Sequence, residues 1–176
     1  SAVLRPFAAP LETSPGGLMN LVTMAFGYAI NVSPMQLLTL YNAIGNNGTM
    51  VSPYLVNSVR YNGVVVKQNE PVILEQQICK PATLEAAQNA LKLVVTEGSG
   101  HGVFKDLPFL VAGKTGTAQV ADRGIGYAHR VYQASFAGYF RANNPQYSCI
   151  VVVRTRAGSG LYYGGQLAAP VFKEIA

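Results

Sequence analysis

Few residues in this sequence are suited to binding a metal ion. Cys79 and Cys149 stand alone without a Cys-x-x-Cys pair, and His101 and His129 have no partner at ligand spacing. Because zinc sites need several such ligands close together, we predict no metal site and interpret both cysteines as small buried residues. The glycine-rich stretch 98–102 follows a predicted helix instead of opening one, as a dinucleotide-binding fingerprint would. We therefore expect no cofactor.

Charged side chains are also scarce. The 176 residues include 13 Lys and Arg and 8 Asp and Glu, which gives a net charge of +5. The basic residues are scattered rather than clustered, so the sequence does not favour nucleic-acid binding. With 49% apolar residues, the composition indicates a globular chain, and the length suits one domain with a sizeable core.

Long apolar runs are absent as well. No stretch approaches the ~20 apolar residues that span a bilayer, because Asn20 and Asn31 interrupt the most apolar window, residues 18–32. The sequence also lacks a basic start followed by an apolar run, so we see no signal peptide. If the chain belongs to a membrane protein, we expect its anchor to lie outside these residues.

One stretch, residues 111–120, has a composition that needs a chemical explanation. The apolar segment 107–112 predicts a short buried strand. At Gly113 the composition changes abruptly, and a lysine, two threonines and two glycines arrive while the strand pattern continues to Val120. We place the candidate site here.

The strand pattern divides these polar residues between two faces. Lys114 and Gly116 share one face, and Thr115 and Thr117 share the other. Gly116 has no side chain, so another backbone can lie close against the strand. A cation beside such a gap, flanked by hydroxyls and free backbone amides, suits an extended ligand that carries a carboxylate.

Two other interpretations of the same residues were weighed. Gly113-Lys114-Thr115 matches the end of a phosphate-binding loop, but that motif requires a glycine where this chain has Pro108, and a helix after the loop. The nucleotide interpretation therefore fails. An ordinary exposed strand with an extended lysine side chain remains open from these residues alone.

The first half of the chain carries clear local signals. Ser33 and Gln36 form a capping box with a proline between them, which predicts a helix that ends at the Gly-Asn-Asn-Gly run 45–48. Residues 81–95 have the spacing of a second amphipathic helix, and we interpret 98–102 as its cap and a turn. Asn62-Gly63 predicts a hairpin between strands at 54–61 and 64–67. Residues 1–17 are predicted to be an irregular lead-in.

The second half predicts strands and a final helix. Residues 122–130 are polar and suggest a mobile loop beside the site. Residues 135–141 and 147–154 form a predicted strand pair, and the final helix is predicted at 168–176. The continuous apolar run 149–153 indicates a central strand with both faces covered and a neighbour on each edge. Because only one neighbour is evident, we expect this fragment to self-associate.

Several segments together resemble the transpeptidase domain of class B penicillin-binding proteins, the division-type enzymes that cross-link peptidoglycan. The resemblance implies an α+β fold, with an antiparallel sheet and packed helices, that is part of the penicillin-binding and serine β-lactamase-like fold. It covers nearly all of residues 20–176, and six blocks in the family's order make it specific. These blocks are Gly27-Tyr28 with Ser33-Pro-Met-Gln-Leu37, Tyr41-Asn-Ala-Ile-Gly-Asn-Asn-Gly48, Val94-Val-Thr-Glu-Gly-Ser-Gly100, Ala112-Gly-Lys-Thr-Gly-Thr-Ala118, Ala134-Ser-Phe-Ala-Gly138 and Tyr163-Gly-Gly-Gln-Leu-Ala-Ala-Pro-Val-Phe172.

Members of this family use three catalytic motifs, and only one of them occurs here. No serine in the chain begins a Ser-x-x-Lys or Ser-x-Asn motif, whereas Lys114-Thr115-Gly116 matches the third motif. The resemblance therefore implies that residues 1–176 are the C-terminal portion of a single transpeptidase domain. We expect no catalytic nucleophile in this fragment, and we expect the fragment alone to be inactive.

The resemblance also implies roles for the strand residues. Lys114 would supply positive charge to the missing serine cluster and to the substrate carboxylate. Hydroxyls of Thr115 and Thr117 would bind that carboxylate or the acid group of a β-lactam, and Gly116 completes the binding segment. The backbone amide of Thr117 would form half of an oxyanion hole.

The implied activity is D,D-transpeptidation of peptidoglycan stem peptides ending in D-Ala-D-Ala, with β-lactams as inhibitors. The implied parent is anchored in the bacterial cytoplasmic membrane, with this domain on the outer side, and works with division or elongation proteins. Two alternatives remain at this point: a β-lactamase or carboxypeptidase of the same superfamily, and a non-catalytic β-lactam sensor or scaffold.

Overall fold

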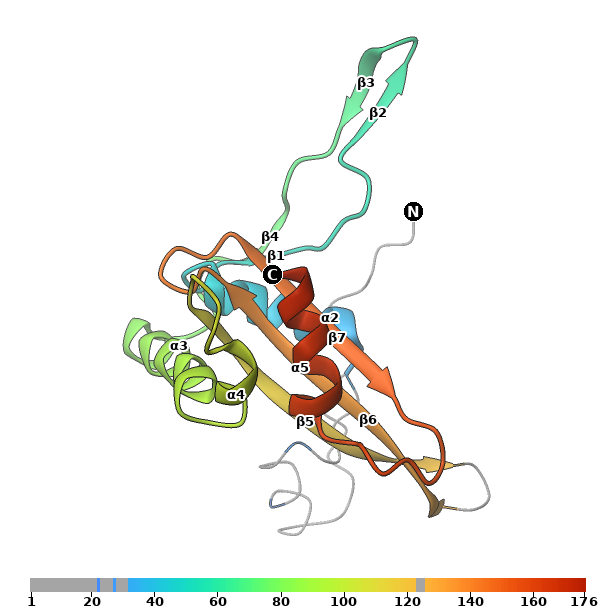
Figure 1. Ribbon diagram of the computed structural model, residues 1–176. Coiled ribbons are helices and arrows are strands. Elements are labelled where there is room, and N and C mark those ends of the chain that lie inside the picture. The colour runs from blue at the N-terminus through green and yellow to red at the C-terminus, as the bar shows by residue number, and fades with distance from the viewer. Residues whose placement is uncertain (1–21, 23–26, 28–31, 123–125) are drawn as a thin grey trace.

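The computed structural model describes residues 22, 27, 32–122 and 126–176 (Figure 1). The predicted lead-in 1–17 and most of the window 18–32 lie outside the described residues. A three-stranded antiparallel sheet forms the centre of the fold, and helices cover both of its faces. The predicted α+β class with an antiparallel sheet is confirmed.

The sheet has the strand order β5-β6-β7, with β5 at Val111–Asp122, β6 at Gly126–Phe140 and β7 at Tyr147–Arg154. Lys114 pairs with Ala137, and Ala137 in turn pairs with Ile150. Consecutive strands along the chain are therefore also neighbours in the sheet.

Two predicted boundaries around β5 were wrong. The strand predicted from residue 107 begins only at Val111, because Pro108 cannot donate a ladder hydrogen bond and the segment before Val111 crosses from a helix. The loop predicted at 122–130 is largely strand: β5 continues to Asp122 and β6 starts at Gly126. The hydrogen bonds between two long antiparallel strands continue along both of them, so the polar side chains of this segment did not end the pairing of β5 with β6.

The helices predicted in the first half are confirmed. Helix α2 (Pro34–Gly45) begins at Ser33 with both hydrogen bonds of the capping box, and helix α3 occupies Pro81–Thr96. The turn after α3 is capped by Gly100 N, which donates to the carbonyl of Val94. The short helix α4 (His101–Phe104) follows, so His101 belongs to a helix instead of the predicted turn.

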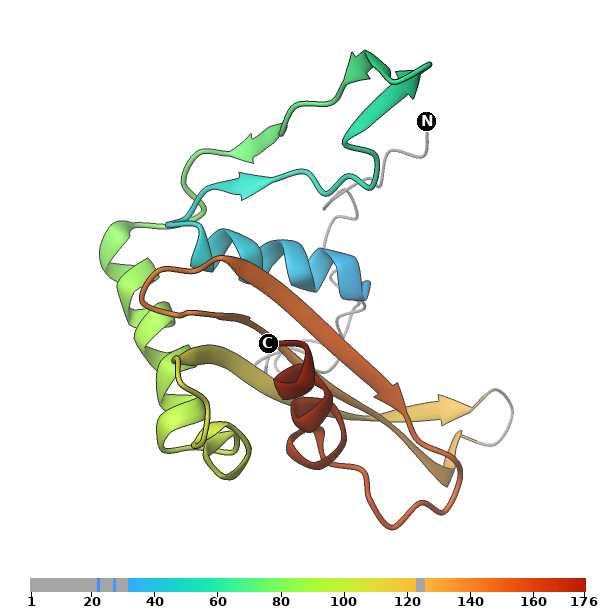
Figure 2. The same cartoon turned by 45° about the horizontal axis from the view of Figure 1, so that its top comes forward.

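Two small two-stranded sheets lie outside the main one. Strand β1 (Met50–Val51) pairs with β4 (Ile73–Glu75), and β2 (Ser58–Tyr61) pairs with β3 (Val64–Gln68). The predicted Asn-Gly turn is confirmed, since Asn62 and Gly63 have φ angles of 46° and 82°. Strand β2 is shorter than predicted. This hairpin projects away from the body of the fold (Figure 2).

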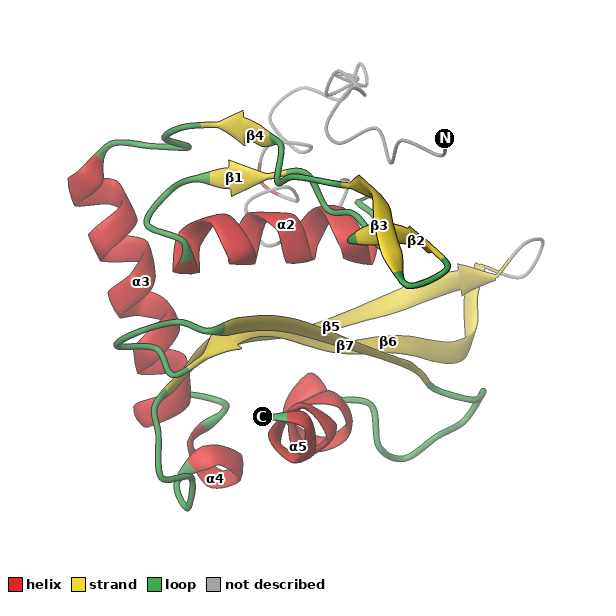
Figure 3. Ribbon diagram, turned by 90° about the horizontal axis from the view of Figure 1, so that it is seen from above, coloured by secondary structure: helices red, strands yellow, loops and turns green. Residues whose placement is uncertain are grey.

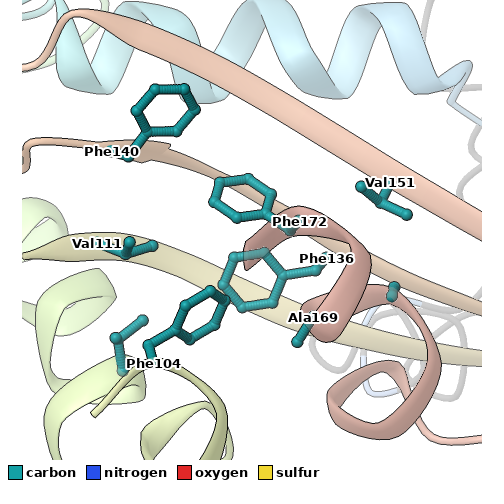
Figure 4. Close-up of a cluster of buried hydrophobic side chains, with 9 residues drawn as sticks. Phe104, Val111, Phe136, Phe140, Val151, Ala169 and Phe172 are labelled. Atoms are coloured by element: carbon teal, nitrogen blue, oxygen red, sulfur yellow. The ribbon is translucent and has the colours of Figure 1, made fainter. Parts of the chain in front are cut away.

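The main core lies between the sheet and helix α5 (Gly164–Ile175) (Figures 3 and 4). Phe136 of β6 and Phe172 of α5 are fully buried, and their ring centroids lie 4.7 Å apart. Phe104 of α4 completes the group, with its centroid 5.0 Å from that of Phe136. These separations are typical of favourable aromatic pairs, so α4 and α5 are fixed on the same face of the sheet.

The opposite face of the sheet is covered by α2 (Figure 3). Tyr139 packs there in a second cluster with Ala112 and Ala142, and a Cβ atom at Gly45 of α2 would lie only 3.1 Å from its ring. The Tyr139 hydroxyl is buried and has no hydrogen-bond partner among the described residues, and burial raises the pKa of Tyr139 to about 12. Gly45 is therefore the residue that lets α2 approach the sheet closely.

Strand β7 has the environment predicted for it on three of four sides. Helix α5 covers one face, α2 covers the other, and β6 pairs with one edge. Within the described residues, no strand pairs with the outer edge of β7. The structure therefore contains an unpartnered edge next to apolar side chains.

Helix α5 begins earlier than predicted, at Gly164 instead of residue 168, and Pro170 lies inside it. Its first turn sits directly on the strands. A Cβ atom at Gly164 would overlap the carbonyl oxygens of Ser135 and Gly116 and would lie 3.1 Å from the Gly116 amide nitrogen. Only glycine permits this approach, and the sequence pattern alone did not reveal it.

We predict that Gly164→Ala lowers the free energy of unfolding by ~1–3 kcal/mol, because the added methyl group must push α5 away from the strands. Alanine has the higher helix propensity, so a loss cannot come from helix formation itself. Equilibrium unfolding in urea at one fixed protein concentration measures the change. The matched control is Gly160→Ala, where a Cβ would meet no atom within 4 Å. Equal stabilities for both variants would show that α5 does not need this contact.

Candidate functional site

Along the outer edge of β5, no strand among the described residues pairs with the backbone groups. Thr155 N donates to the carbonyl of Tyr132 at 2.9 Å, and Tyr132 N donates to the Thr155 hydroxyl. The N–H and C=O groups of Tyr132 therefore both point toward the β7 side of β6. Directions alternate along an antiparallel ladder, so the odd-numbered residues of β6 face β5. Ser135 pairs with Gly116, so the N–H and C=O groups of Gly116 point toward β6. The N–H and C=O groups of its neighbours Thr115 and Thr117 therefore point away from β6, toward the outer edge of the sheet. No strand among the described residues covers them.

The predicted division of side chains between the two faces is observed. Gly116 lies opposite Ser135, whose hydroxyl occupies the space that a side chain at Gly116 would need. Thr117 points to the other face, where its hydroxyl accepts a hydrogen bond from Gly164 N at 3.1 Å. The hydroxyl proton of Thr117 is left free to donate to a ligand.

Lys114 reaches around the edge of the strand. Its Nζ atom donates to the carbonyl oxygen of Thr115 at 2.9 Å and lies 3.4 Å from the Thr115 hydroxyl. The side chain is exposed. The ammonium group and the two threonines are therefore brought together at the open edge, although Lys114 originates on the opposite face from the threonine side chains.

A third hydroxyl, which sequence reasoning missed, belongs to this group. Ser99, in the turn between α3 and α4, lies 2.9 Å from the Thr115 hydroxyl through its own Oγ. One sequence signal pointed to Ser99, which lies in the block 94–100 that resembles the transpeptidase family. The interpretation of 98–102 as a helix cap and turn assigns Ser99 no role in the site. His101 is exposed on α4 and lines a different hollow.

An open pocket of about 300 Å³ lies over these hydroxyls. Its walls come from the turn after α3, from β5 and from the start of α5. The lining residues are Ser99, Thr115, Thr117, Tyr163, Gly164, Gly165 and Gln166. The lining contains hydroxyl and amide groups without any carboxylate, and the Lys114 ammonium lies beside it. Such a pocket suits a small anion such as a carboxylate.

The described residues contain no group of three or more His, Cys, Asp or Glu side chains that could hold a metal ion. Cys79 and Cys149 are free and half-buried, which differs from the full burial predicted, and burial raises the pKa of the Cys149 thiol. In the part of the chain that the structure describes, no helix is long and apolar enough to cross a bilayer.

Known proteins with similar sequences include a sporulation protein and a peptidoglycan D,D-transpeptidase homolog. The chain is 33% identical over 168 residues to stage V sporulation protein D of Bacillus subtilis, covering 94% of this chain and 25% of that protein. It is 30% identical over 178 residues to the peptidoglycan D,D-transpeptidase FtsI homolog of Mesostigma viride, covering 94% of this chain and 29% of that protein. The chain thus spans about a quarter of the length of these curated relatives.

Solved structures show the same fold. The transpeptidase domain of the FtsI4 D,D-transpeptidase from Legionella pneumophila is 28% identical, with a TM-score of 0.64 over 89% of this chain and 50% of that one. Penicillin-binding protein 2B from Streptococcus pneumoniae, at 23% identity, has a TM-score of 0.76 over 95% of this chain and 27% of that one. The predicted partial penicillin-binding fold is confirmed.

The resemblance drawn from six sequence blocks is tested most directly by a family model, and that model matches residues 13–176. Sequence relatives and structural neighbours agree with it. The chain belongs to the penicillin-binding protein transpeptidase domain family.

Proposed function

We propose that this chain is the C-terminal portion of a D,D-transpeptidase domain that cross-links peptidoglycan stem peptides through a serine acyl-enzyme and binds penicillin. The observation that carries the proposal is the open edge of β5, where outward backbone groups, two threonine hydroxyls and the Lys114 ammonium meet. Support also comes from relatives that are named peptidoglycan D,D-transpeptidases.

In the proposed reaction, a stem peptide ending in D-Ala-D-Ala adds to β5 as an extended strand. Its terminal carboxylate binds the hydroxyls of Thr115 and Thr117 beside Lys114. The scissile carbonyl then lies next to the outward amide of Thr117, which donates to the oxygen as negative charge develops. Removing one such donor typically costs ~3–4 kcal/mol of transition-state stabilisation.

The nucleophile in this proposal comes from another part of the protein. The sequence contains no Ser-x-x-Lys, and the serines near the site have other contacts: Ser99 bonds to Thr115, and Ser135 packs beside Gly116. A longer chain, the parent protein, would supply the missing serine, its lysine and the Ser-x-Asn loop. The fragment contributes the carboxylate-binding wall.

The parent protein is proposed to be anchored in the bacterial cytoplasmic membrane by a segment outside these 176 residues, with this domain on the outer side. There it meets peptidoglycan and β-lactams, and proteins of the division or elongation machinery are its proposed partners. The pocket over Thr115 and Thr117 supports the substrate part of this proposal, because its hydroxyls and the neighbouring Lys114 ammonium can bind an acid group.

We predict that the 176-residue chain forms no covalent adduct with penicillin, because it lacks the activated serine. Incubation with benzylpenicillin followed by intact-protein mass spectrometry should show an unmodified mass. The parent protein, treated identically, is the positive control and should gain one penicilloyl group. A stoichiometric adduct on any serine of this chain would refute the fragment proposal.

In the parent protein we predict that Lys114→Ala lowers the rate of β-lactam acylation by about 100-fold or more, because the site loses its cation. The fold should survive, since Lys114 is exposed and its removal leaves no cavity. A fluorescent penicillin followed over time gives the rate, and thermal unfolding checks the fold. The matched control is Lys105→Ala, another exposed lysine. An unchanged acylation rate would show that Lys114 is a surface residue without a role in acylation.

We also predict that this chain self-associates through the outer edge of β7, because an unpaired apolar strand recruits another chain. Val152 lies on this strand and is 38% exposed. Light scattering should give a mass above that of the 18.7 kDa monomer, and Val152→Lys should lower it. Val59→Lys, at a 45% exposed position on the projecting hairpin, is the control. A stable wild-type monomer at the highest soluble concentration would disprove the idea.

A further inference from the structure

A second hollow lies farther along β5 and has no role in the function proposed above. It has a volume of about 680 Å³ and is formed by the distal parts of β5 and β6 together with the segment that connects β7 to α5. Its lining residues are Gln119, Arg130, Tyr132, Gly158, Ser159, Gly160 and Tyr162. Among the described residues of this lining, Arg130 is the charged one.

A stack of tyrosine rings joins this hollow to the carboxylate pocket. Tyr132 of β6 and Tyr162 are stacked with their centroids 4.5 Å apart and their planes 21° apart. Tyr162 also contacts Tyr163 at 4.3 Å between centroids, and its hydroxyl donates to the Tyr163 hydroxyl at 3.1 Å. Tyr163 lines the first pocket and Tyr162 lines the second, so one aromatic wall runs past both.

Arg130 is held in an unusual backbone conformation beside this wall. Its φ angle of 48° lies in the left-handed region, where the backbone of a non-glycine residue is strained. Among the described residues, no hydrogen bond or ion pair engages its guanidinium. A strained, exposed arginine with no acidic side chain among the described residues of its hollow is available for an anionic ligand.

The direction in which the bound peptide runs follows from helix α3, which covers the outer edge of β5 at the start of this strand. Helix α3 crosses the edge there, with Leu91 packed near Ala112 and Val95 packed against Val111. Ser99 then bonds to Thr115. A ligand whose terminal carboxylate sits at Thr115 and Thr117 therefore has its open path past Gln119, toward the second hollow.

We propose that Arg130 and the Tyr132–Tyr162 stack bind a second carboxylate of the acyl-donor peptide, two or three residues before its C-terminus. The spacing is set by the register: Val131 pairs with Val120, so Arg130 lies about four residues, or ~13 Å, beyond Thr117. A peptide extended by ~3.3 Å per residue covers ~7–10 Å of this distance in two or three residues, and the long side chain of Arg130 spans the rest. A guanidinium binds a carboxylate through paired hydrogen bonds, whereas a neutral amide offers no charge. This inference rests on the proposed function and makes the site selective for acidic over amidated stem peptides.

The test uses the full-length parent protein and two donor peptides ending in D-Ala-D-Ala. The peptides are identical except that the residue preceding D-Ala-D-Ala carries a free side-chain carboxylate in one and a carboxamide in the other. We expect wild type to prefer the acid by about 5- to 10-fold in kcat/KM. Arg130→Gln should abolish this preference by slowing the acid donor alone, and Arg130→Lys should keep part of it. Arg156→Gln, which removes an exposed arginine outside the lining, should keep all of it.

Benzylpenicillin, which has no second carboxylate, separates the possible failures. Equal kcat/KM for the two donors in a wild-type enzyme that benzylpenicillin acylates would overturn this inference and leave the proposed function standing. Loss of benzylpenicillin acylation in Arg130→Gln, as large as its loss with the acid donor, would also overturn it by assigning Arg130 a general structural role. A wild-type parent that benzylpenicillin does not acylate would remove the proposed function and this inference together.

Discussion

The candidate site depends on a close approach of two backbones at Gly164 and Gly116. Helix α5 starts directly on the Gly116–Ser135 strand pair, at a distance that a side chain at Gly164 would prevent. This approach places the Gly164 amide on the Thr117 hydroxyl and sets Tyr163 beside the pocket. The same helix carries Phe172, which is buried against Phe136. Core packing and site geometry are therefore consequences of one steric arrangement.

An open strand edge is both the proposed binding device and a hazard. The outward groups of Thr115 and Thr117 must lack a partner strand if an extended peptide is to pair with them, yet such edges also recruit unwanted strands. On β5 this hazard is reduced, because α3 covers the first part of the edge and Lys114 places a charge on the next part. Strand β7 exposes the apolar side chain of Val152, and its one charged residue, Arg154, lies at the end of the strand.

Predictions that rest on neighbouring residues were the successful ones. The Ser33 capping box, the Asn-Gly turn of the hairpin and the alternation of side chains along β5 each depend on contacts within a few residues. Predictions of where long elements begin failed. Strand β5 starts late because Pro108 interrupts the ladder, and the predicted loop at 122–130 is mostly strand because β5 and β6 pair along their length. Helix α5 starts early because its first turn packs on distant strand residues.

The sequence alone determined which chemical groups the site can use: a lysine, two hydroxyls and a glycine on one strand, with their faces set by the two-residue period of that strand. It also determined the family, through blocks spread along the whole chain. Only the tertiary structure decided that Ser99 meets Thr115 across 16 residues and that Gly164 meets Thr117 across 47. No local sequence pattern predicts these two contacts. Burial of the aromatic core fixes α4 and α5 on the sheet, and this places Ser99 and Gly164 beside the two threonines.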